Sequence, residues 1–100
     1  MITYKIHQIK DIANTDYAFR DYDPKKFNLK DYKKVYESAP FDTDKIFDTE
    51  LCEEIFTIFN TCIPEGFKGH SLSVSDIVEI NVDGSSRFYY CNSLGWQRIT

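Results

Sequence analysis

The sequence predicts an α+β domain in which a mainly antiparallel sheet of about five strands packs against one principal helix. Three observations support this fold class. Apolar residues recur at helical spacing in one segment, at about residues 49–60, whereas over residues 2–9 and 77–82 they alternate with polar residues as in strands. The dipeptide Asp83-Gly84 is a strong signal for a hairpin turn. With 100 residues, 42% of them hydrophobic, residues 1–100 are long enough for a single domain with its own core.

The first strand is predicted over residues 2–9. Ile2, Tyr4 and Ile6 fall on one face of this strand, and polar residues fall on the other. The following residues have the composition of a turn or loop. Residues 17–22 then alternate weakly, and we expect a short strand there.

Two prolines delimit the next elements. Asp23-Pro24 predicts the start of a short helix, because an acidic residue can cap a helix and proline is tolerated in its first turn. Residues 32–38 fit either a helix or a strand, and their valine and tyrosines favour the strand. The element ends at Ala39-Pro40 in either case, because a residue before proline avoids the helical conformation.

The principal helix is predicted over residues 49–60. Asp48 or Thr49 can cap its N-terminus, and the acidic residues of its first turns suit the positive end of the helix dipole. Pro64 prevents the helix from continuing. The apolar stripe that should face the sheet consists of Leu51, Ile55, Ile58 and Phe59.

The last third of the chain predicts a three-stranded meander. Residues 77–82 form its first strand, and Asp83-Gly84 turns the chain into a return strand over residues 87–91. A second turn leads to a final strand over residues 96–99. Because a hairpin alone is only marginally stable, we expect the N-terminal strand and the helix to complete this sheet.

The cysteines and the N-terminal sequence indicate a cytoplasmic protein. Cys52, Cys62 and Cys91 are odd in number and match no zinc-binding spacing, so we expect three free thiols on small buried side chains. The N-terminus does not resemble a signal peptide, and no apolar stretch is long enough for a membrane anchor. The net charge of -4 disfavours non-specific binding to nucleic acid or anionic lipid.

The densest motif precedes the meander. Its serines alternate with apolar residues that can point inward, while the serines point outward or bond the local backbone. The acidic residue at its end predicts a tight turn in which side-chain oxygens accept backbone N–H groups, so replacing it with alanine should cost about 1–2 kcal/mol. The motif consists of Gly69, His70, Ser71, Leu72, Ser73, Val74, Ser75 and Asp76.

This motif resembles the hallmark of the YodL-like domain family. The similar segment reads GHSLSVSDIV over residues 69–78, and the hairpin YYCNSLGW over residues 89–96 resembles the closing pattern of the same family. The resemblance extends over nearly the whole chain. It implies a single YodL-like domain of the kind found in Firmicutes, either alone or within large proteins of conjugative elements and phages. An accessory protein of a mobile element, or a small regulator, is therefore expected, with no implied catalytic activity or cofactor.

Protein binding is the function that the residues favour. Tyr89, Tyr90 and Trp96 concentrate aromatic side chains in the last strands, and aromatic residues are enriched at interfaces. Neighbouring residues of a strand point to opposite faces, so one of the two tyrosines should be exposed unless a second layer covers it. The sequence does not indicate the partner or the oligomeric state.

Three alternatives remain open. A hydrolase-like site could combine His70, Ser71 and Asp76, although residues so close along the chain seldom converge on one point. Nucleic acid could bind the basic stretch Lys25–Lys34, with Tyr22, Phe27 or Tyr32 stacking on bases. The acidic stretch Asp42–Glu54 could mimic nucleic acid. A metal site would have to recruit both histidines, His7 and His70, together with carboxylates, so no metal or other cofactor is expected.

Overall fold

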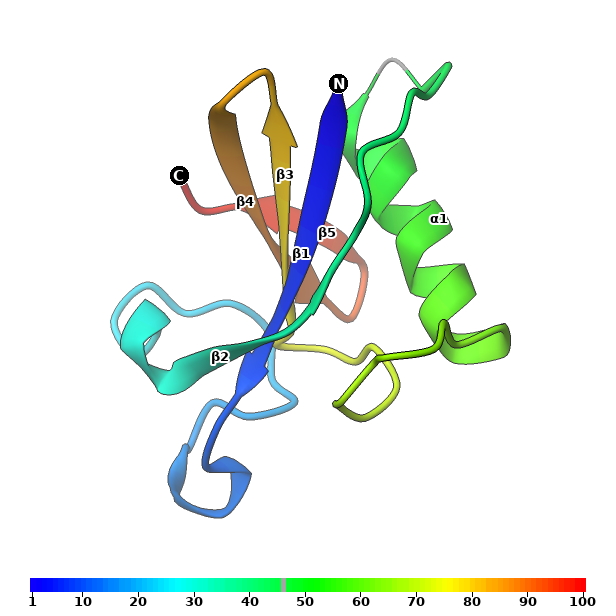
Figure 1. Ribbon diagram of the computed structural model, residues 1–100. Coiled ribbons are helices and arrows are strands. Elements are labelled where there is room, and N and C mark those ends of the chain that lie inside the picture. The colour runs from blue at the N-terminus through cyan, green and yellow to red at the C-terminus, as the bar shows by residue number, and fades with distance from the viewer. Residues whose placement is uncertain (46) are drawn as a thin grey trace.

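One antiparallel sheet and one helix form the framework of the chain (Figure 1). The computed structural model describes residues 1–45 and 47–100. The strands lie in the order β2-β1-β3-β4-β5, and every neighbouring pair is antiparallel, which confirms the predicted α+β class. The strands and the α-helix are β1 (Ile2–Ile9), β2 (Tyr32–Glu37), α1 (Asp48–Thr61), β3 (Ile77–Val82), β4 (Ser85–Asn92) and β5 (Gly95–Arg98). Two short 3₁₀ helices, η1 (Ile12–Asn14) and η2 (Leu29–Asp31), lie between β1 and β2.

The C-terminal meander β3-β4-β5 has the predicted hairpin at its first turn. Val82 pairs with Ser85, so only Asp83 and Gly84 make the connection. Their φ angles of 51° and 90° lie in the left-handed region that a type I′ hairpin turn requires at both positions. This turn matches the right-handed twist of the two strands, which explains why the local dipeptide was sufficient to predict it.

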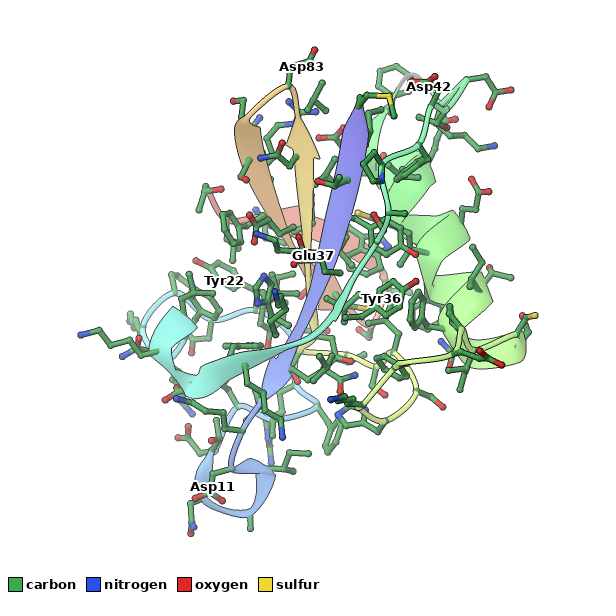
Figure 2. The ribbon with its side chains drawn as sticks, viewed as in Figure 1. Asp11, Tyr22, Tyr36, Glu37, Asp42 and Asp83 are labelled. Carbon is green, nitrogen blue, oxygen red and sulfur yellow. The ribbon has the colours of Figure 1, made fainter. Side chains whose placement is uncertain are left out.

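The main core lies between α1 and one face of the sheet. The helix buries three residues of the predicted stripe, Leu51, Ile55 and Phe59, and it also buries Cys52. The fourth stripe residue, Ile58, is only half-buried. Phe59 is the centre of an aromatic group, with its ring 5.0 Å from Tyr36 and 6.3 Å from Tyr4 between ring centroids. Figure 2 shows Tyr36 on the helix side of the sheet, and this packing fixes α1 on that face.

A second layer covers part of the opposite face, and it corrects the predicted strand at residues 17–22. These residues form turns and not a strand, and Tyr17 is buried against the sheet face. Their backbone does not join a ladder, because the N–H groups of Phe19 and Tyr22 donate to the side chains of Ser75 and Asn92. The Tyr90 hydroxyl donates to the Arg20 carbonyl at 2.6 Å, and the Tyr22 ring lies 5.2 Å from the Tyr90 ring. We call residues 17–27 the excursion between β1 and β2. In Figures 1 and 2 this segment, with Tyr22, lies on the far side of the sheet from α1.

The short helix expected at Asp23-Pro24 is only a single turn. The backbone N–H groups of Lys26 and Phe27 both donate to the Asp23 carbonyl, at 3.1 Å and 3.0 Å, and no helix continues from them. Phe27 then packs into the second layer, so burial of its ring ends the turn.

Asp48 does not cap α1 but ties the helix to the sheet. Phe47 occupies the cap position, so the predicted cap by Asp48 or Thr49 is wrong. The Asp48 carboxylate accepts two hydrogen bonds from the Arg87 guanidinium and one from the Tyr89 hydroxyl at 2.7 Å. The hydrogen bond from Arg87 is the main reason that the pKa of Asp48 is lowered, and it outweighs the opposing effect of burial. Asp48 therefore forms a long-range ion pair with Arg87 and does not cap the helix locally.

All three cysteines are free, as predicted, but Cys62 is exposed at the C-terminal end of α1 and not buried. Cys52 and Cys91 are buried, and burial raises the pKa of the Cys91 thiol to about 12. We expect one thiol to react rapidly with a water-soluble disulfide reagent at neutral pH and the other two only after unfolding. Cys62→Ser should abolish the fast phase, and two fast thiols in the wild type would contradict this assignment.

In the part of the chain that the structure describes, no helix combines the length and the apolar character needed to cross a membrane.

Candidate functional site

The motif Gly69–Asp76 wraps around the side chain of Gln8, which projects from β1. Gln8 is 1% exposed, and its amide nitrogen donates to the His70 carbonyl at 2.8 Å and to Asp76 Oδ2 at 3.0 Å. Its amide oxygen accepts from the His70 N–H at 3.2 Å. Gly69 passes so close that a Cβ built on it would lie 2.0 Å from Gln8 Oε1. The glycine is therefore needed for the close approach of two chain segments.

Asp76 closes the turn at the end of the motif, with the geometry that the sequence predicts. Its Oδ2 accepts the Ser73 N–H at 2.8 Å, and its own N–H donates to the Ser73 carbonyl at 3.1 Å. The residue is 1% exposed. Burial raises the pKa of Asp76 to about 7, although the Ser73 N–H, the nearby His70 and Gln8 partly counteract this effect.

Ser75 joins the motif to three other parts of the fold. The prediction that the serines point outward or bond the local backbone is confirmed for the exposed Ser71 and for Ser73, whose hydroxyl donates to the Ser71 carbonyl. Ser75 differs, because it is 2% exposed and bonds distant segments. Its hydroxyl accepts the Phe19 N–H at 2.9 Å, its carbonyl accepts the Tyr32 hydroxyl at 2.6 Å, and its N–H donates to the Cys91 carbonyl at 2.9 Å. With a φ of 81°, Ser75 also has a strained backbone, which these contacts hold in place.

The residues of the hydrolase-like alternative do not form a nucleophile–base–acid arrangement. The His70 ring uses Nδ1 to contact the Ser71 carbonyl oxygen at 2.7 Å, and no hydrogen bond between described atoms joins this ring to the Ser71 hydroxyl. The Asp76 carboxyl is bonded to Ser73 and Gln8. Nucleophilic catalysis would need the hydroxyl and the base within hydrogen-bond reach.

The two tyrosines of the predicted aromatic surface are buried, so that prediction is wrong for them. Tyr89 is 7% exposed on the helix face, and its hydroxyl is bonded to Asp48. Tyr90 is 0% exposed because the excursion between β1 and β2 forms the second layer that covers it. Trp96 is half-buried, and its indole N–H donates to Glu53 at 2.9 Å. It lines a small hollow of about 130 Å³ next to Phe56.

The basic stretch Lys25–Lys34 is exposed, but the aromatic residues expected beside it are not available for stacking. Tyr32 is buried, and Tyr22 and Phe27 pack into the second layer. Two of the lysines are already in ion pairs, Lys26 with Asp16 at 3.6 Å and Lys34 with Glu37 at 2.6 Å. The stretch is therefore a charged surface without the stacking platform of a single-strand binder.

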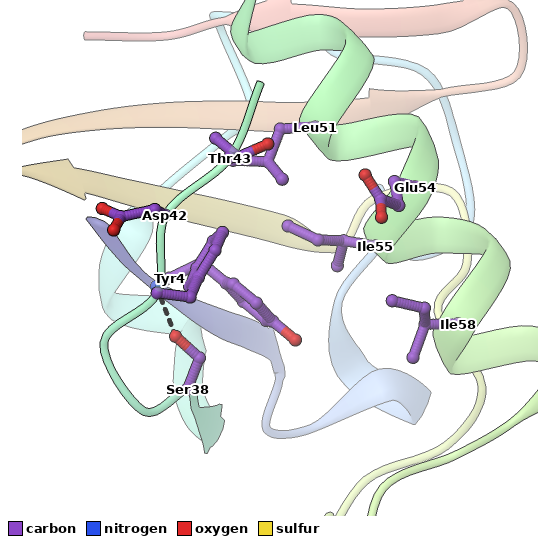
Figure 3. Close-up of a pocket in the computed structure, with 9 residues that line it drawn as sticks. Tyr4, Ser38, Asp42, Thr43, Leu51, Glu54, Ile55 and Ile58 are labelled. Atoms are coloured by element: carbon purple, nitrogen blue, oxygen red, sulfur yellow. Dashed lines mark hydrogen bonds between the residues drawn. The ribbon is translucent and has the colours of Figure 1, made fainter. Parts of the chain in front are cut away.

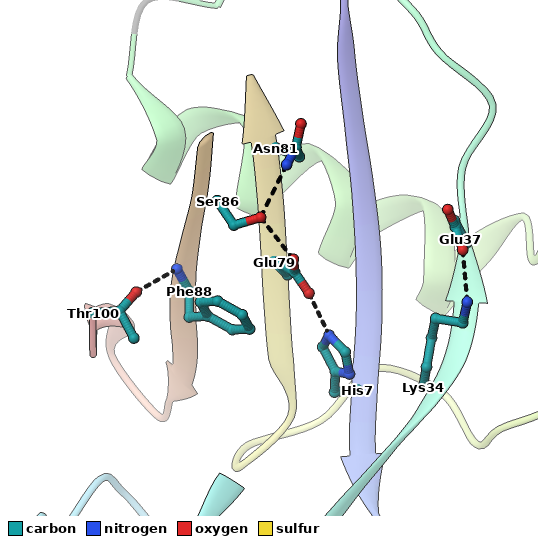
Figure 4. A network of polar contacts seen from close by, with 8 residues as sticks. All are labelled: His7, Lys34, Glu37, Glu79, Asn81, Ser86, Phe88 and Thr100. Atoms are coloured by element: carbon teal, nitrogen blue, oxygen red, sulfur yellow. Dashed lines mark hydrogen bonds and ion pairs between the residues drawn. The ribbon is translucent and has the colours of Figure 1, made fainter. Parts of the chain in front are cut away.

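The two histidines lie in different places. His7 contacts Glu79 Oε1 at 2.9 Å on the sheet face opposite α1, and Glu79 also accepts the Ser86 hydroxyl at 2.8 Å (Figure 4). Burial alone would raise the pKa of Glu79, but the hydrogen bonds from His7 and Ser86 leave it lowered. Among the described residues, no three His, Cys, Asp or Glu side chains are close enough to hold a metal ion.

A pocket opens between α1 and the chain that follows β2, and the sequence analysis did not predict it. Residues 38–41 run beside β1, where the Tyr4 N–H donates to the Ser38 hydroxyl and Phe41 forms a β-bridge with Ile2. The pocket has a volume of about 280 Å³ (Figure 3). Its lining residues are Tyr4, Ser38, Phe41, Asp42, Thr43, Leu51, Glu54, Ile55 and Ile58. The half-buried Ile58 was the one local signal, because its side chain faces this pocket.

Comparison with known proteins identifies the family. No curated protein matches the chain, and no solved structure matches it. The family model described as the YodL-like domain matches residues 3–100, which include the turn around Gln8, α1 and the whole meander. The chain therefore belongs to the YodL-like domain family.

Proposed function

We propose that this chain is a non-catalytic protein-binding module, and that its docking point is the pocket between α1 and residues 38–43. The observation that carries the proposal is the open pocket of about 280 Å³, into which Leu51, Ile55 and Ile58 present apolar side chains from one helix. Interfaces concentrate their binding energy in such pockets, where a few anchor side chains of the partner become desolvated.

The size and setting of the pocket favour a protein partner. A pocket of about 280 Å³ lies at the lower limit of the range of about 300–1,000 Å³ that is usual for small-molecule sites, and it has room for one anchoring side chain of a partner. Phe47, which precedes α1 and is 64% exposed, adds an apolar side chain outside the lining. The three free thiols support a reducing, cytoplasmic setting for this interaction, and an accessory role in a mobile element would be compatible with it.

Selection of displayed random peptides can test this function. Ile58→Trp should fill the pocket, whereas Thr57→Trp places the same side chain on an exposed neighbouring position of α1. Peptides selected on the wild type should bind Thr57→Trp equally well. They should bind Ile58→Trp at least about fivefold more weakly, since loss of one anchor typically costs more than about 1 kcal/mol. Circular dichroism checks that both variants fold. Selected peptides that bind all three proteins equally would place the docking point elsewhere.

A further inference from the structure

We propose that the pocket between α1 and residues 38–43 takes the side chain of a lysine or arginine from the partner. This inference rests on the proposed function and names the chemistry of the anchoring residue. The alkyl stem of such a side chain would lie along the apolar wall formed by Leu51, Ile55 and Ile58. Its cationic head would lie at the Glu54 carboxylate and the Tyr4 hydroxyl, which line the same pocket.

The Tyr4 hydroxyl is a polar group held beside the apolar wall of the pocket. The Tyr4 ring is held by contacts with Tyr36 and Phe41, each 5.9 Å away between ring centroids. Figure 3 shows the hydroxyl pointing across the pocket toward the side chains of α1. It forms no hydrogen bond with any residue that the structure describes, so a ligand that donates a hydrogen bond would satisfy its oxygen.

The charges of the pocket specify a cation. Glu54 and Asp42 both line it, and no lysine, arginine or histidine is among its described lining residues. Neither carboxylate belongs to an ion pair within the described part of the chain. The pKa of Tyr4 is raised to about 12, mainly by burial and then by the neighbouring Tyr36 and Glu54. The hydroxyl is therefore neutral at physiological pH. The contribution of Glu54 also shows that its carboxylate lies close to this hydroxyl.

A basic side chain fits both properties of the pocket. Lysine and arginine carry a long apolar stem and a charged head, and they bury the stem while the head stays at a polar rim. An uncharged aliphatic side chain would cover the Tyr4 hydroxyl without pairing it. An acidic side chain would be repelled by the Glu54 carboxylate, so the pocket also selects against it.

Small probes with the same stem and different heads can test the inference. The protein, labelled at isoleucine and leucine methyl groups, is titrated with n-butylammonium, n-butylguanidinium, n-butanol and butyrate, and the signals of Leu51, Ile55 and Ile58 are followed by NMR. The two cations should bind about threefold to fivefold more tightly than n-butanol, the range expected for a partly exposed ion pair, and more weakly at high salt. Butyrate should bind least.

Two charge variants identify the residue responsible. Glu54→Gln should reduce the affinity for n-butylammonium to that for n-butanol, whereas Glu50→Gln, which removes an equal charge from α1 outside the pocket, should leave it unchanged. Tyr4→Phe, with its fold checked by circular dichroism, should also weaken n-butylammonium binding. Equal binding of n-butanol and n-butylammonium, or no effect of Glu54→Gln, would overturn the inference.

The peptide selection separates this inference from the proposed function. Peptides that lose binding to Ile58→Trp and share a lysine or arginine at one position would support both. Peptides that lose binding to Ile58→Trp but share an uncharged apolar residue would overturn the basic anchor and leave the docking pocket in place.

Discussion

Raising the pH from about 5 to about 8 is expected to weaken folding, and Asp76→Asn is expected to abolish most of this dependence. The pKa of Asp76 is raised from 3.8 to about 7 in the folded chain, chiefly by burial. The folded state thus retains a proton that the unfolded state has already released. The contribution of this proton to the free energy of unfolding is fully present below pH 3.8 and is lost as the pH rises through about 7.

The expected effect of Asp76 is large. At about 1.4 kcal/mol per factor of ten in the ionisation constant, a pKa change from 3.8 to about 7 corresponds to an upper value of about 4 kcal/mol over the whole range. About 3 kcal/mol of this falls between pH 5 and pH 8. The carboxyl groups of Asp48 and Glu79 have lowered pKa values and act in the opposite direction. Their contribution is lost only as the pH falls below the unfolded values of 3.8 and 4.5, which lies outside the tested window.

Urea unfolding of four proteins at both pH values measures this effect. Asp76→Asn retains an oxygen for Ser73 and Gln8 without a buried charge, so it should exceed the wild type in stability at the higher pH. Asp76→Ala loses both hydrogen bonds and should be about 2 kcal/mol less stable than Asp76→Asn. Asp44→Asn at an exposed position is the control and should follow the wild type. A parallel pH dependence in the wild type and Asp76→Asn would rule out Asp76 as the source.

Gly69→Ala is expected to lower the free energy of unfolding by about 2–3 kcal/mol, which is the cost of breaking buried hydrogen bonds. The new Cβ would lie 2.0 Å from Gln8 Oε1 and 3.2 Å from the Phe67 ring. Gln8 cannot move aside without cost, because it is 1% exposed and its amide is bonded to His70 and Asp76. The clash therefore releases β1 from the motif.

A double-mutant cycle tests this cause directly. Gln8→Ala removes the atoms that the new Cβ would meet, so Gly69→Ala should cost much less in the Gln8→Ala background than in the wild type. Both single variants and the double variant are compared by urea unfolding. Additive costs would mean that the glycine acts through its own backbone and not through contact with Gln8.

Several parts of this fold follow from neighbouring residues alone. The helix was predicted almost to its ends because the spacing of Leu51, Ile55 and Phe59 is a property of one continuous segment. The β3-β4 turn followed from Asp83 and Gly84, since their left-handed conformations are set by residue type. The turn closed by Asp76 is also local, because its acceptor lies three positions from its donor.

The remaining features depend on segments that meet only after folding. Residue alternation correctly placed Tyr89 and Tyr90 on opposite faces, but their burial depends on α1 and on the excursion between β1 and β2. The partner of His70 and Asp76 is Gln8, more than sixty positions away along the chain. The pocket likewise exists only where residues 38–43 run between β1 and α1. Local periodicity specifies which face of an element is apolar, whereas the covering of that face is set by long-range packing that no single segment encodes.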